Sequence, residues 1–445
     1  MLDFKLLIDS LDNYDIFEGM TSIRAIIEGI DSGVNNRKIS TILYDKNKMV
    51  KNAKTIGYLK AVSSKYDYEL KELTLQEVPD FIKGRSFKAI NVTIPYKETV
   101  MPYLDEVSDM AKKIGSVNTI VNKNGKLYGY NTDYYGFSYM LEYGGISVKG
   151  KNVAVLGSGG ASKTVVATLR DLGANNVIVV SRSGEINYEN VSERKDINVI
   201  VNASPVGMYP NVGQCLVNLD DFPLLEGVAD LVYNPSLTEI LRRAKEKGVA
   251  YVNGLSMLVA QAKKACELFI DTKIDDGEID RITDIVASET KNIIFVGMPG
   301  CGKSTIAKII ATKLGREFVD TDYEFNSTYG ISPADCIKEN GEQDFRDKES
   351  FVVSSVCKQS KKVIATGGGA VIREENRIAI RQNAVVVWID RPLTALATKD
   401  RPLSGDIDRL KTLYETRKKY YNDVSDIKID NSGSLYNSIL QIEKA

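Results

Sequence analysis

Two stretches of the chain share one pattern: a run of apolar residues, a glycine-rich turn, and then apolar positions repeated at helical spacing. They cover residues 151–172 and 293–314. Short aliphatic runs of this kind predict buried strands, and apolar residues three and four positions apart predict the helices that follow them. Strand, glycine turn and helix together are typical of nucleotide-binding units, so the pattern predicts an α/β chain.

The second glycine turn fits the pattern G-x-x-x-x-G-K-S. In such a loop the backbone N–H groups surround phosphate oxygens, the lysine reaches the β and γ phosphates, and the serine reaches a magnesium ion. The alternative, a chance glycine-rich turn, is disfavoured by the strand before it and the periodic helix after it. The turn therefore predicts binding of ATP with Mg²⁺. The residues expected to contact them are Gly300, Gly302, Lys303, Ser304 and Thr305, with Gly297 opening the pattern.

The first glycine turn predicts a dinucleotide site. Gly157 and Gly159 fit the G-x-G positions at which pyrophosphate approaches the backbone, although Ser162 replaces the third glycine. The next strand ends in Arg182 where an NAD enzyme carries an acidic residue, which favours the 2′-phosphate of NADP. Alternatively, this arginine is a solvent-exposed residue at the end of a strand and binds no cofactor. The residues expected to approach the dinucleotide are Gly157, Gly159, Gly160, Ala161, Ser181 and Arg182.

Upstream of the first turn, polar residues follow three successive predicted strands. Lys97 follows one strand, Asn118 begins the next, and Asn131 and Asp133 come directly after the third. Lys97 alone would suit a protein surface, and Asp133 alone would suit the start of a helix. Their occurrence together at strand ends predicts a ligand site.

Composition narrows the chemistry that the chain can perform. The length of 445 residues suggests about three domains of roughly 150 residues each, and an apolar content of 43% is sufficient for buried cores. The 58 basic and 59 acidic residues nearly balance, so nothing favours a nucleic-acid partner. There is no histidine, which excludes histidine triads, metal sites and bases. Lysine, arginine and carboxylates must therefore supply the chemistry.

Cysteine use and hydropathy bear on location. The five cysteines form no C-x-x-C pair, and their odd number disfavours a disulfide framework. No apolar run reaches membrane-spanning length, and residues 1–12 lack the features of a signal peptide. We therefore expect a cytoplasmic protein that acts on small molecules and has no membrane partner.

Motifs spread over residues 66–288 resemble shikimate dehydrogenase. They are residues 91–97, 117–119, 131–133, 157–162, 202–208, 233–235 and 257–262. The resemblance implies that Lys97 and Asp133 form the catalytic pair and that the nicotinamide supplies hydride. It also implies substrate contacts from Thr93, Asn118, Tyr233 and Gln261. A site without histidine must use an amine or a carboxylate for proton transfer, which agrees with this implication.

Residues 1–65 depart from that family. The family begins with a strand and a turn of closely spaced hydroxyl residues that hold the substrate carboxylate. Here, residues 17–26 and 38–40 resemble instead the N-terminal RNA-binding module of SPOUT-class ribose methyltransferases, although no methyltransferase domain follows. Ser63 and Ser64 are too close to Tyr66 to lie in the hydroxyl turn. Whether the family's first strand is present is left open; its loss would leave a sheet edge unpaired or newly covered.

Residues 291–445 resemble shikimate kinase. Asp320 is expected to help hold magnesium, Asp322 to accept the proton of the substrate hydroxyl, and Arg346 to bind its carboxylate, with Glu349 orienting that arginine. Glycines 367–369 would let the backbone approach the substrate ring, Gly368 among the contacts. By the resemblance, Arg401 covers the phosphates and Arg417 is a second carboxylate ligand. Any one of these arginines alone could form a surface ion pair.

Together these inferences predict a bifunctional α/β enzyme of the shikimate pathway. It would reduce 3-dehydroshikimate with NADPH and phosphorylate the shikimate formed, with ATP and Mg²⁺. The expected divisions are an αβ appendage at 1–65, a substrate domain at 66–130 and 240–288, a Rossmann domain at 131–239, and a P-loop kinase with a parallel five-stranded sheet at 291–445. Two alternatives are an active kinase with an impaired dehydrogenase half, and an RNA-associated role for the appendage.

Overall fold

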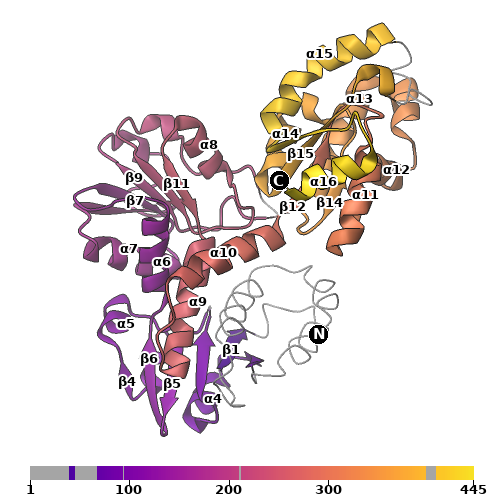
Figure 1. Ribbon diagram of the computed structural model, residues 1–445. Helices are drawn as coiled ribbons and strands as arrows, with labels where there is room; N and C mark the ends of the chain where they lie inside the picture. Colours follow the sequence, from indigo (N-terminus) through magenta and orange to yellow (C-terminus); the bar gives the residue numbers. More distant parts are fainter. Residues whose placement is uncertain (1–39, 46–67, 94, 210–211, 397–406, 445) are drawn as a thin grey trace. The chain divides into compact units, whose positions relative to one another are not determined.

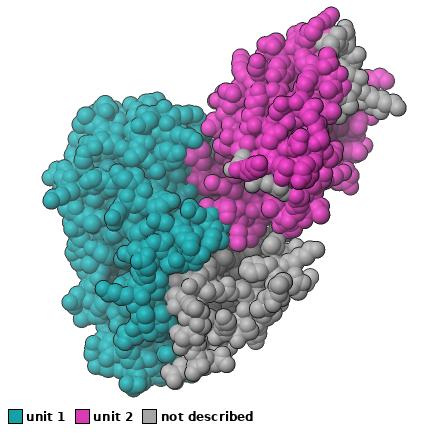
Figure 2. Space-filling model, in the orientation of Figure 1, with its two compact units in different colours: residues 1–233, 238–286 teal, residues 234–237, 287–445 magenta. Residues whose placement is uncertain are grey.

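The computed structural model describes residues 40–45, 68–93, 95–209, 212–396 and 407–444. The chain forms two compact units (Figure 2), one of residues 1–233 and 238–286, the other of residues 234–237 and 287–445. Residues 17–26 of the segment that resembles a methyltransferase module, and also Ser63, Ser64 and Arg401, lie outside the described residues. Among the described helices, none is long and apolar enough to cross a bilayer.

The first unit begins with a six-stranded mixed sheet in the order β2-β1-β3-β5-β6-β4. Its strands are β1 Ser40–Asp45, β2 Tyr68–Leu73, β3 Ala89–Val92, β4 Glu106–Val107, β5 Thr119–Lys123 and β6 Lys126–Tyr130. β1 lies between β2 and β3 and pairs in parallel with both, Ile42 opposite Leu70 on one side and Asn91 on the other. The first strand of the sheet is therefore present. Residues 40–45 were expected in a separate appendage, but they belong to this sheet.

Helices and buried aliphatic residues stabilise one part of this sheet. Helices α4 Val78–Gly84 and α5 Asp109–Ile114 lie beside the sheet (Figure 1). Val78 and Ile82 of α4 are fully buried in one cluster with Ile90 of β3 and Ile120 of β5. Since β3 is buried at all four positions, any polar side chain on it must find a partner or a ligand.

A second, wholly parallel sheet has the order β11-β10-β9-β7-β8. Its strands are β7 Asn152–Leu156, β8 Asn176–Val180, β9 Val199–Asn202, β10 Gly227–Asp230 and β11 Ala250–Asn253. Helices α6 Asp133–Tyr143, α7 Gly160–Asp171 and α8 Glu239–Lys247 accompany it. The expected end of this domain at residue 239 is too early, because β11 pairs with β10 beyond that point. Helices α9 Leu255–Ile270 and α10 Gly277–Thr290 follow.

The second unit holds a parallel five-stranded sheet in the order β13-β14-β12-β15-β16, as predicted. Its strands are β12 Asn292–Val296, β13 Phe318–Asp320, β14 Val363–Ala365, β15 Ala384–Asp390 and β16 Ile427–Asp430. Its helices are α11 Lys303–Leu314, α12 Thr321–Tyr329, α13 Pro333–Cys357, α14 Glu374–Gln382, α15 Ile407–Val424 and α16 Leu435–Lys444. The carboxyl ends of β12, β13 and β14 place the glycine turn, Asp320 and glycines 367–369 at one edge of the sheet.

Candidate active sites

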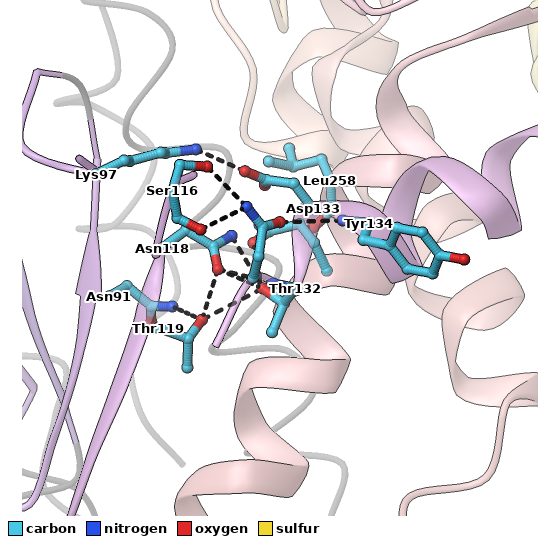
Figure 3. Close-up of polar contacts among 11 residues, drawn as sticks. Asn91, Lys97, Ser116, Asn118, Thr119, Thr132, Asp133, Tyr134 and Leu258 are labelled. Carbon is cyan, nitrogen blue, oxygen red and sulfur yellow. Dashed lines mark hydrogen bonds and ion pairs between the residues drawn. The ribbon is translucent and has the colours of Figure 1, made fainter. Parts of the chain in front are cut away.

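In the first unit, the structure joins the two residues expected to form the catalytic pair. The Lys97 ammonium lies 2.7 Å from the Asp133 carboxylate, and the two side chains are 28% and 17% exposed (Figure 3). Lys97 follows β3, and Asp133 is the first residue of α6. Because backbone N–H groups at a helix start favour negative charge, this position stabilises the carboxylate. The two side chains therefore form a contact that is still accessible to a ligand.

Asn118 is held by a network of uncharged groups next to this pair. Its amide nitrogen donates to the Thr132 hydroxyl at 3.0 Å, and its oxygen accepts from the Thr132 backbone N–H at 2.8 Å and from Thr119 at 3.0 Å. Asn131 is anchored in the same region, since it donates to the backbone oxygen and hydroxyl of Ser116 at 3.0 and 2.9 Å. These bonds fix the positions of both amides before any ligand arrives.

Asn91 joins this network although the sequence analysis did not assign it a role. Its amide nitrogen lies 3.4 Å from the Thr119 hydroxyl, while its amide oxygen is buried without a hydrogen-bond partner. A buried polar atom of this kind is costly unless something binds it. The signal available from the sequence was a single asparagine within an apolar strand, two positions before Thr93.

Gln261 reaches the site because α6 and α9 pack closely. A Cβ atom added at Gly136 of α6 would lie 2.6 Å from the Met257 carbonyl and 2.9 Å from the Gln261 Cβ, so only glycine fits there. The Gln261 amide donates to the Leu258 carbonyl at 3.1 Å. Its oxygen lies 3.5 Å from the Thr132 hydroxyl. Gln261 and Asn118 therefore contact the same threonine.

Thr93 and Tyr233 follow strand ends of the two sheets in this unit. Thr93 comes directly after β3, and Tyr233 comes after β10; both are half-buried. Their places are compatible with the substrate contacts expected from the sequence.

The first glycine turn has the geometry of a cofactor loop. Gly157 has φ of +114°, and a Cβ atom there would lie 3.1 Å from the Ala203 carbonyl. Gly159 precedes α7 and Gly160 begins it, and nothing lies within 4 Å of a Cβ atom built on either. Exposed N–H groups at a helix start bind phosphate well. Arg182 is exposed after β8, and Ser181 is half-buried.

A buried carboxylate supports the neighbouring loop. Asp230 is fully buried at the end of β10 and accepts hydrogen bonds from Asn202 at 2.8 Å, from Thr238 at 2.5 Å and from the Val232 N–H at 3.0 Å. Burial raises the pKa of Asp230 to about 7 despite these bonds. Asn202 in turn accepts from the Ser204 hydroxyl at 2.7 Å, so Asp230 helps to shape the loop after β9.

In the second unit, the glycine turn adopts a phosphate-binding conformation. Gly297, Gly300 and Gly302 have φ values of +146°, +80° and +102°, which disfavour residues with a side chain. Lys303 is buried, and its ammonium donates to the Gly297 and Met298 carbonyls at 3.0 Å each. The lysine therefore lies inside the loop that is expected to surround the phosphates.

Ser304 and Asp320 fit a magnesium ion. The Ser304 hydroxyl donates to the Asp320 carboxylate at 2.7 Å, so two oxygen donors of the kind that Mg²⁺ prefers already meet. Within the described ranges, no three Cys, Asp or Glu side chains gather into a metal site by themselves. The remaining ligands of such an ion would be phosphate oxygens and water, as is usual for Mg²⁺ at nucleotides. Thr305, next in the helix, is exposed.

Arg346, Glu349 and the glycine loop form the other end of this site. The Arg346 guanidinium donates to Glu349 at 2.6 Å and to Glu342 at 3.1 Å. Burial raises the pKa of Glu349, and the charge of Arg346 opposes that shift. A Cβ atom at Gly369 would lie 2.4 Å from the Arg346 guanidinium. A side chain at this position would therefore force the loop or the arginine to move.

The remaining predicted groups converge on the same glycine loop. A Cβ atom at Gly367 would lie 2.8 Å from the Asp322 carboxylate, which places Asp322 against the loop. Arg417 is 4% exposed and donates to the Gly368 carbonyl at 3.2 Å. Asp322, Arg346 and Arg417 therefore surround glycines 367–369.

Comparison with known proteins gives two family matches. A model of shikimate kinase matches residues 299–444, and a model of the shikimate dehydrogenase substrate-binding domain matches residues 54–120, beginning upstream of Tyr66. The NADP(+) shikimate dehydrogenase of Clostridium perfringens is 40% identical over 242 residues, which cover 52% of this chain and 87% of that protein. The enzyme of the same name from Clostridium beijerinckii is 37% identical over 273 residues, covering 58% and 98%.

Solved structures also match this chain, among them one with a similar fold. It is a chorismate mutase/shikimate 5-dehydrogenase fusion protein from Clostridium acetobutylicum, with 34% sequence identity and a TM-score of 0.51 over 57% of this chain and 98% of that one. The comparisons confirm the resemblances to shikimate dehydrogenase and to shikimate kinase that were expected from the sequence.

Proposed function

This chain belongs to the shikimate dehydrogenase family and carries a shikimate kinase domain after it, and from this premise we propose that it catalyses two successive reactions. The first is the reduction of 3-dehydroshikimate to shikimate with NADPH. The second is the transfer of the ATP γ-phosphoryl group to shikimate, giving shikimate 3-phosphate. The product of the first reaction is the substrate of the second.

For the reduction, Lys97 and Asp133 act as the catalytic pair. The observation that carries this assignment is their 2.7 Å contact beside a set of fixed amides and hydroxyls. The nicotinamide, when bound, supplies hydride to the carbonyl carbon. Lys97 delivers a proton to the carbonyl oxygen. Asp133 holds the Lys97 ammonium in place and accepts a hydrogen bond from a substrate hydroxyl.

Substrate recognition in the reduction uses neutral hydrogen-bonding groups. Asn118 and Gln261 meet at Thr132, and each has hydrogen-bonding capacity beyond the contacts described above. Thr93 lies at the neighbouring strand end and Tyr233 beside the cofactor sheet. We add Asn91, whose buried amide oxygen lacks a partner and can accept from a substrate hydroxyl.

NADP is held at the first glycine turn. The backbone of Gly157, Gly159, Gly160 and Ala161 receives the pyrophosphate at the start of α7. Ser181 and Arg182 come at the end of β8, where the ribose is expected, and the guanidinium would pair with the 2′-phosphate.

For the phosphoryl transfer, one end of the kinase site binds ATP with Mg²⁺ and the other end binds shikimate. Lys303 and the loop N–H groups hold the phosphates, with Gly300, Gly302 and Thr305 beside them, while Ser304 and Asp320 hold Mg²⁺. Asp322 accepts the proton of the attacking hydroxyl. Arg346 and Arg417, together with the backbone at Gly368, bind the substrate carboxylate and ring. Arg401 is assigned to the phosphates by resemblance alone.

The cytoplasm is the proposed location. All five cysteines are free thiols, four of them buried, as is usual in a reducing compartment. The near-neutral charge gives no support to an RNA-associated role.

The test is a pair of steady-state assays on one purified sample. Wild-type protein should oxidise shikimate with NADP and should also consume ATP when shikimate is added. Lys97→Ala should lose the first activity by about a hundredfold or more and retain the second. Loss of both activities, or of neither, would contradict the assignment of Lys97.

One specific observation keeps the impaired dehydrogenase as a second candidate. In this family a turn of hydroxyl residues after the first strand holds the carboxylate, whereas here no serine or threonine follows β1 before Thr55. Loss of two such bonds would weaken shikimate binding by about a hundredfold. This candidate would be supported by a kinase of ordinary efficiency together with a dehydrogenase whose KM for shikimate is raised by about a hundredfold.

A further inference from the structure

Tyr421 of α15 contacts the glycine loop of the kinase site, and no role has been given to it above. Its side chain is fully buried, and its hydroxyl donates to the Gly368 carbonyl at 2.5 Å. Arg417, one helical turn earlier, donates to the same carbonyl at 3.2 Å. One face of α15 therefore holds this single carbonyl oxygen with two donors.

The same hydroxyl also reaches the phosphate-binding loop. The Tyr421 oxygen lies 3.8 Å from the Met298 sulfur. The backbone of Gly368 passes so close to the next residue of that loop that an added Cβ atom would lie 2.6 Å from the Pro299 ring. The loop expected to hold ATP and the loop expected to hold shikimate thus meet at Gly368, and Tyr421 contacts both.

Packing fixes the position of the phenol ring. The ring stacks on Trp388 of β15, with centroids 5.9 Å apart and planes at 30°. Trp388 is 2% exposed, and the ammonium of Lys428 lies 4.2 Å from its ring centroid. Because the ring cannot turn without disrupting this stack, the direction of the hydroxyl is set by the sheet.

We propose that Tyr421 is a positioning residue of the kinase that couples nucleotide binding to shikimate binding. This inference rests on the proposed kinase function. By holding the Gly368 carbonyl, the hydroxyl fixes the backbone against which Arg346 and Asp322 pack. By contacting Met298, it ties that backbone to the phosphate-binding loop. Ordering of either loop by its ligand then favours the bound arrangement of the other, and the coupling must be reciprocal.

Tyr421→Phe tests the proposal, because phenylalanine retains the stack on Trp388 and loses only the hydroxyl. We expect the shikimate KM to rise about tenfold with a smaller fall in kcat, since one of two donors to a buried carbonyl is lost. The chain has a single tryptophan, so Trp388 fluorescence can follow shikimate titrations with and without a non-hydrolysable ATP analogue. The analogue should tighten shikimate binding in wild type and leave it nearly unchanged in the variant.

Tyr420→Phe is the matched control. It removes the neighbouring hydroxyl of the same helix and keeps the ring that faces Arg377 at 4.5 Å. Its shikimate KM and its response to the analogue should equal those of wild type, and both variants should keep the wild-type melting midpoint within a few degrees.

The possible outcomes distinguish a failure of this inference from a failure of the proposed kinase function. Equal shikimate KM and equal coupling in Tyr421→Phe and Tyr420→Phe would overturn the inference while the kinase stands. A fall in kcat alone, with KM and coupling unchanged, would also overturn it. Absence of shikimate-dependent ATP turnover in wild type and in the control would instead overturn the proposed kinase, and the inference with it.

Discussion

The dehydrogenase unit and the kinase unit each place a basic side chain beside a carboxylate, but they bury the pair to different extents. Lys97 and Asp133 are 28% and 17% exposed, whereas Arg346 and Glu349 are 8% and 6% exposed. A partly exposed pair can exchange protons with a substrate, as acid–base catalysis requires. A buried pair is held in place by its surroundings. Separating its partners leaves a buried charge without compensation, which costs considerable stability. The kinase site should therefore tolerate small changes less well.

The glycine loop at residues 157–160 of the dehydrogenase and the one at residues 367–369 of the kinase also differ in how closely protein atoms surround them. In the dehydrogenase, Cβ atoms at Gly159 and Gly160 would meet nothing within 4 Å. In the kinase, Cβ atoms at Gly367, Gly368 and Gly369 would each meet a protein atom within 2.8 Å. The first loop is shaped to leave room for a cofactor, and the second to let protein groups approach its own backbone. The predictions below test this contrast.

The largest effect is expected from Lys303→Ala. Removing the buried ammonium that we propose to contact the phosphates should lower kinase turnover on the order of a thousandfold, since a preorganised charge in a buried site is lost. The dehydrogenase rate of the same sample should not change. A coupled assay of both activities measures the effect. Lys308→Ala, an exposed lysine of the same helix, is the control; undiminished kinase turnover in Lys303→Ala would refute the role of Lys303.

Gly369→Ala should have the next largest effect. The added methyl group would lie 2.4 Å from the Arg346 guanidinium, so either the loop or the arginine must move. We expect the shikimate KM of the kinase to rise by about a hundredfold, as for loss of a charged carboxylate contact. At Gly433 of the same unit, an added Cβ atom would meet only Asn437 at 3.8 Å, so Gly433→Ala is the control. Equal KM values in the two variants would show that this close approach does not matter.

Arg182→Ala should have a smaller effect, in the other unit. The NADP KM should rise about tenfold while the NAD KM stays the same, because only NADP carries the 2′-phosphate. Arg170→Ala, an exposed arginine of α7, should change neither value. Initial rates with both cofactors provide the measurement, and parallel changes for NADP and NAD would exclude this role for Arg182.

Local patterns in the sequence predicted much of this architecture. The two glycine turns, the strands before them and the helices after them were all expected, because their signals lie within about twenty residues of one another. Strand ends predicted a ligand site that includes Lys97 and Asp133, the resemblance implied that the two form a pair, and the geometry agrees. In the six-stranded sheet, the carboxyl ends of β3 and β6 lie at the same edge as the start of β5, the antiparallel strand between them.

Long-range pairing could not be predicted in this way. Ser40–Asp45 reads as a strand, but its place between β2 and β3 depends on partners up to about fifty residues away. The end of the cofactor domain was placed too early because β11 is short and only its pairing with β10 identifies it. Asn91 lies in an apolar strand and Tyr421 in a helix segment rich in charged residues, and neither residue carries a local signal of what it contacts.

The smallest predicted effect concerns stability, and it compares the buried carboxylates of the two units. Glu349 has a cationic partner in Arg346, whereas the polar contacts described for Asp230 come from uncharged donors. The pKa of Asp230 is raised from 3.8 to about 7 by burial. Between these values the folded protein keeps a proton that the unfolded chain has released. The free energy of unfolding of this unit should therefore fall as pH rises from about 4 to 7, and Asp230 should have no further effect at higher pH.

Asp230→Asn should remove this dependence, because a neutral amide resembles the protonated carboxyl group. A shift of about three units corresponds to about 4 kcal/mol at most, so we expect a difference between wild type and variant of a few kcal/mol across that pH range. Urea unfolding at pH 4.5 and 7.5 measures it. Asp196 is the control, since its bond to Arg194 lowers its pKa, and its titration therefore lies below this window. If Asp230→Asn and Asp196→Asn change with pH as wild type does, Asp230 is ionised in the fold, and its three donors outweigh its burial.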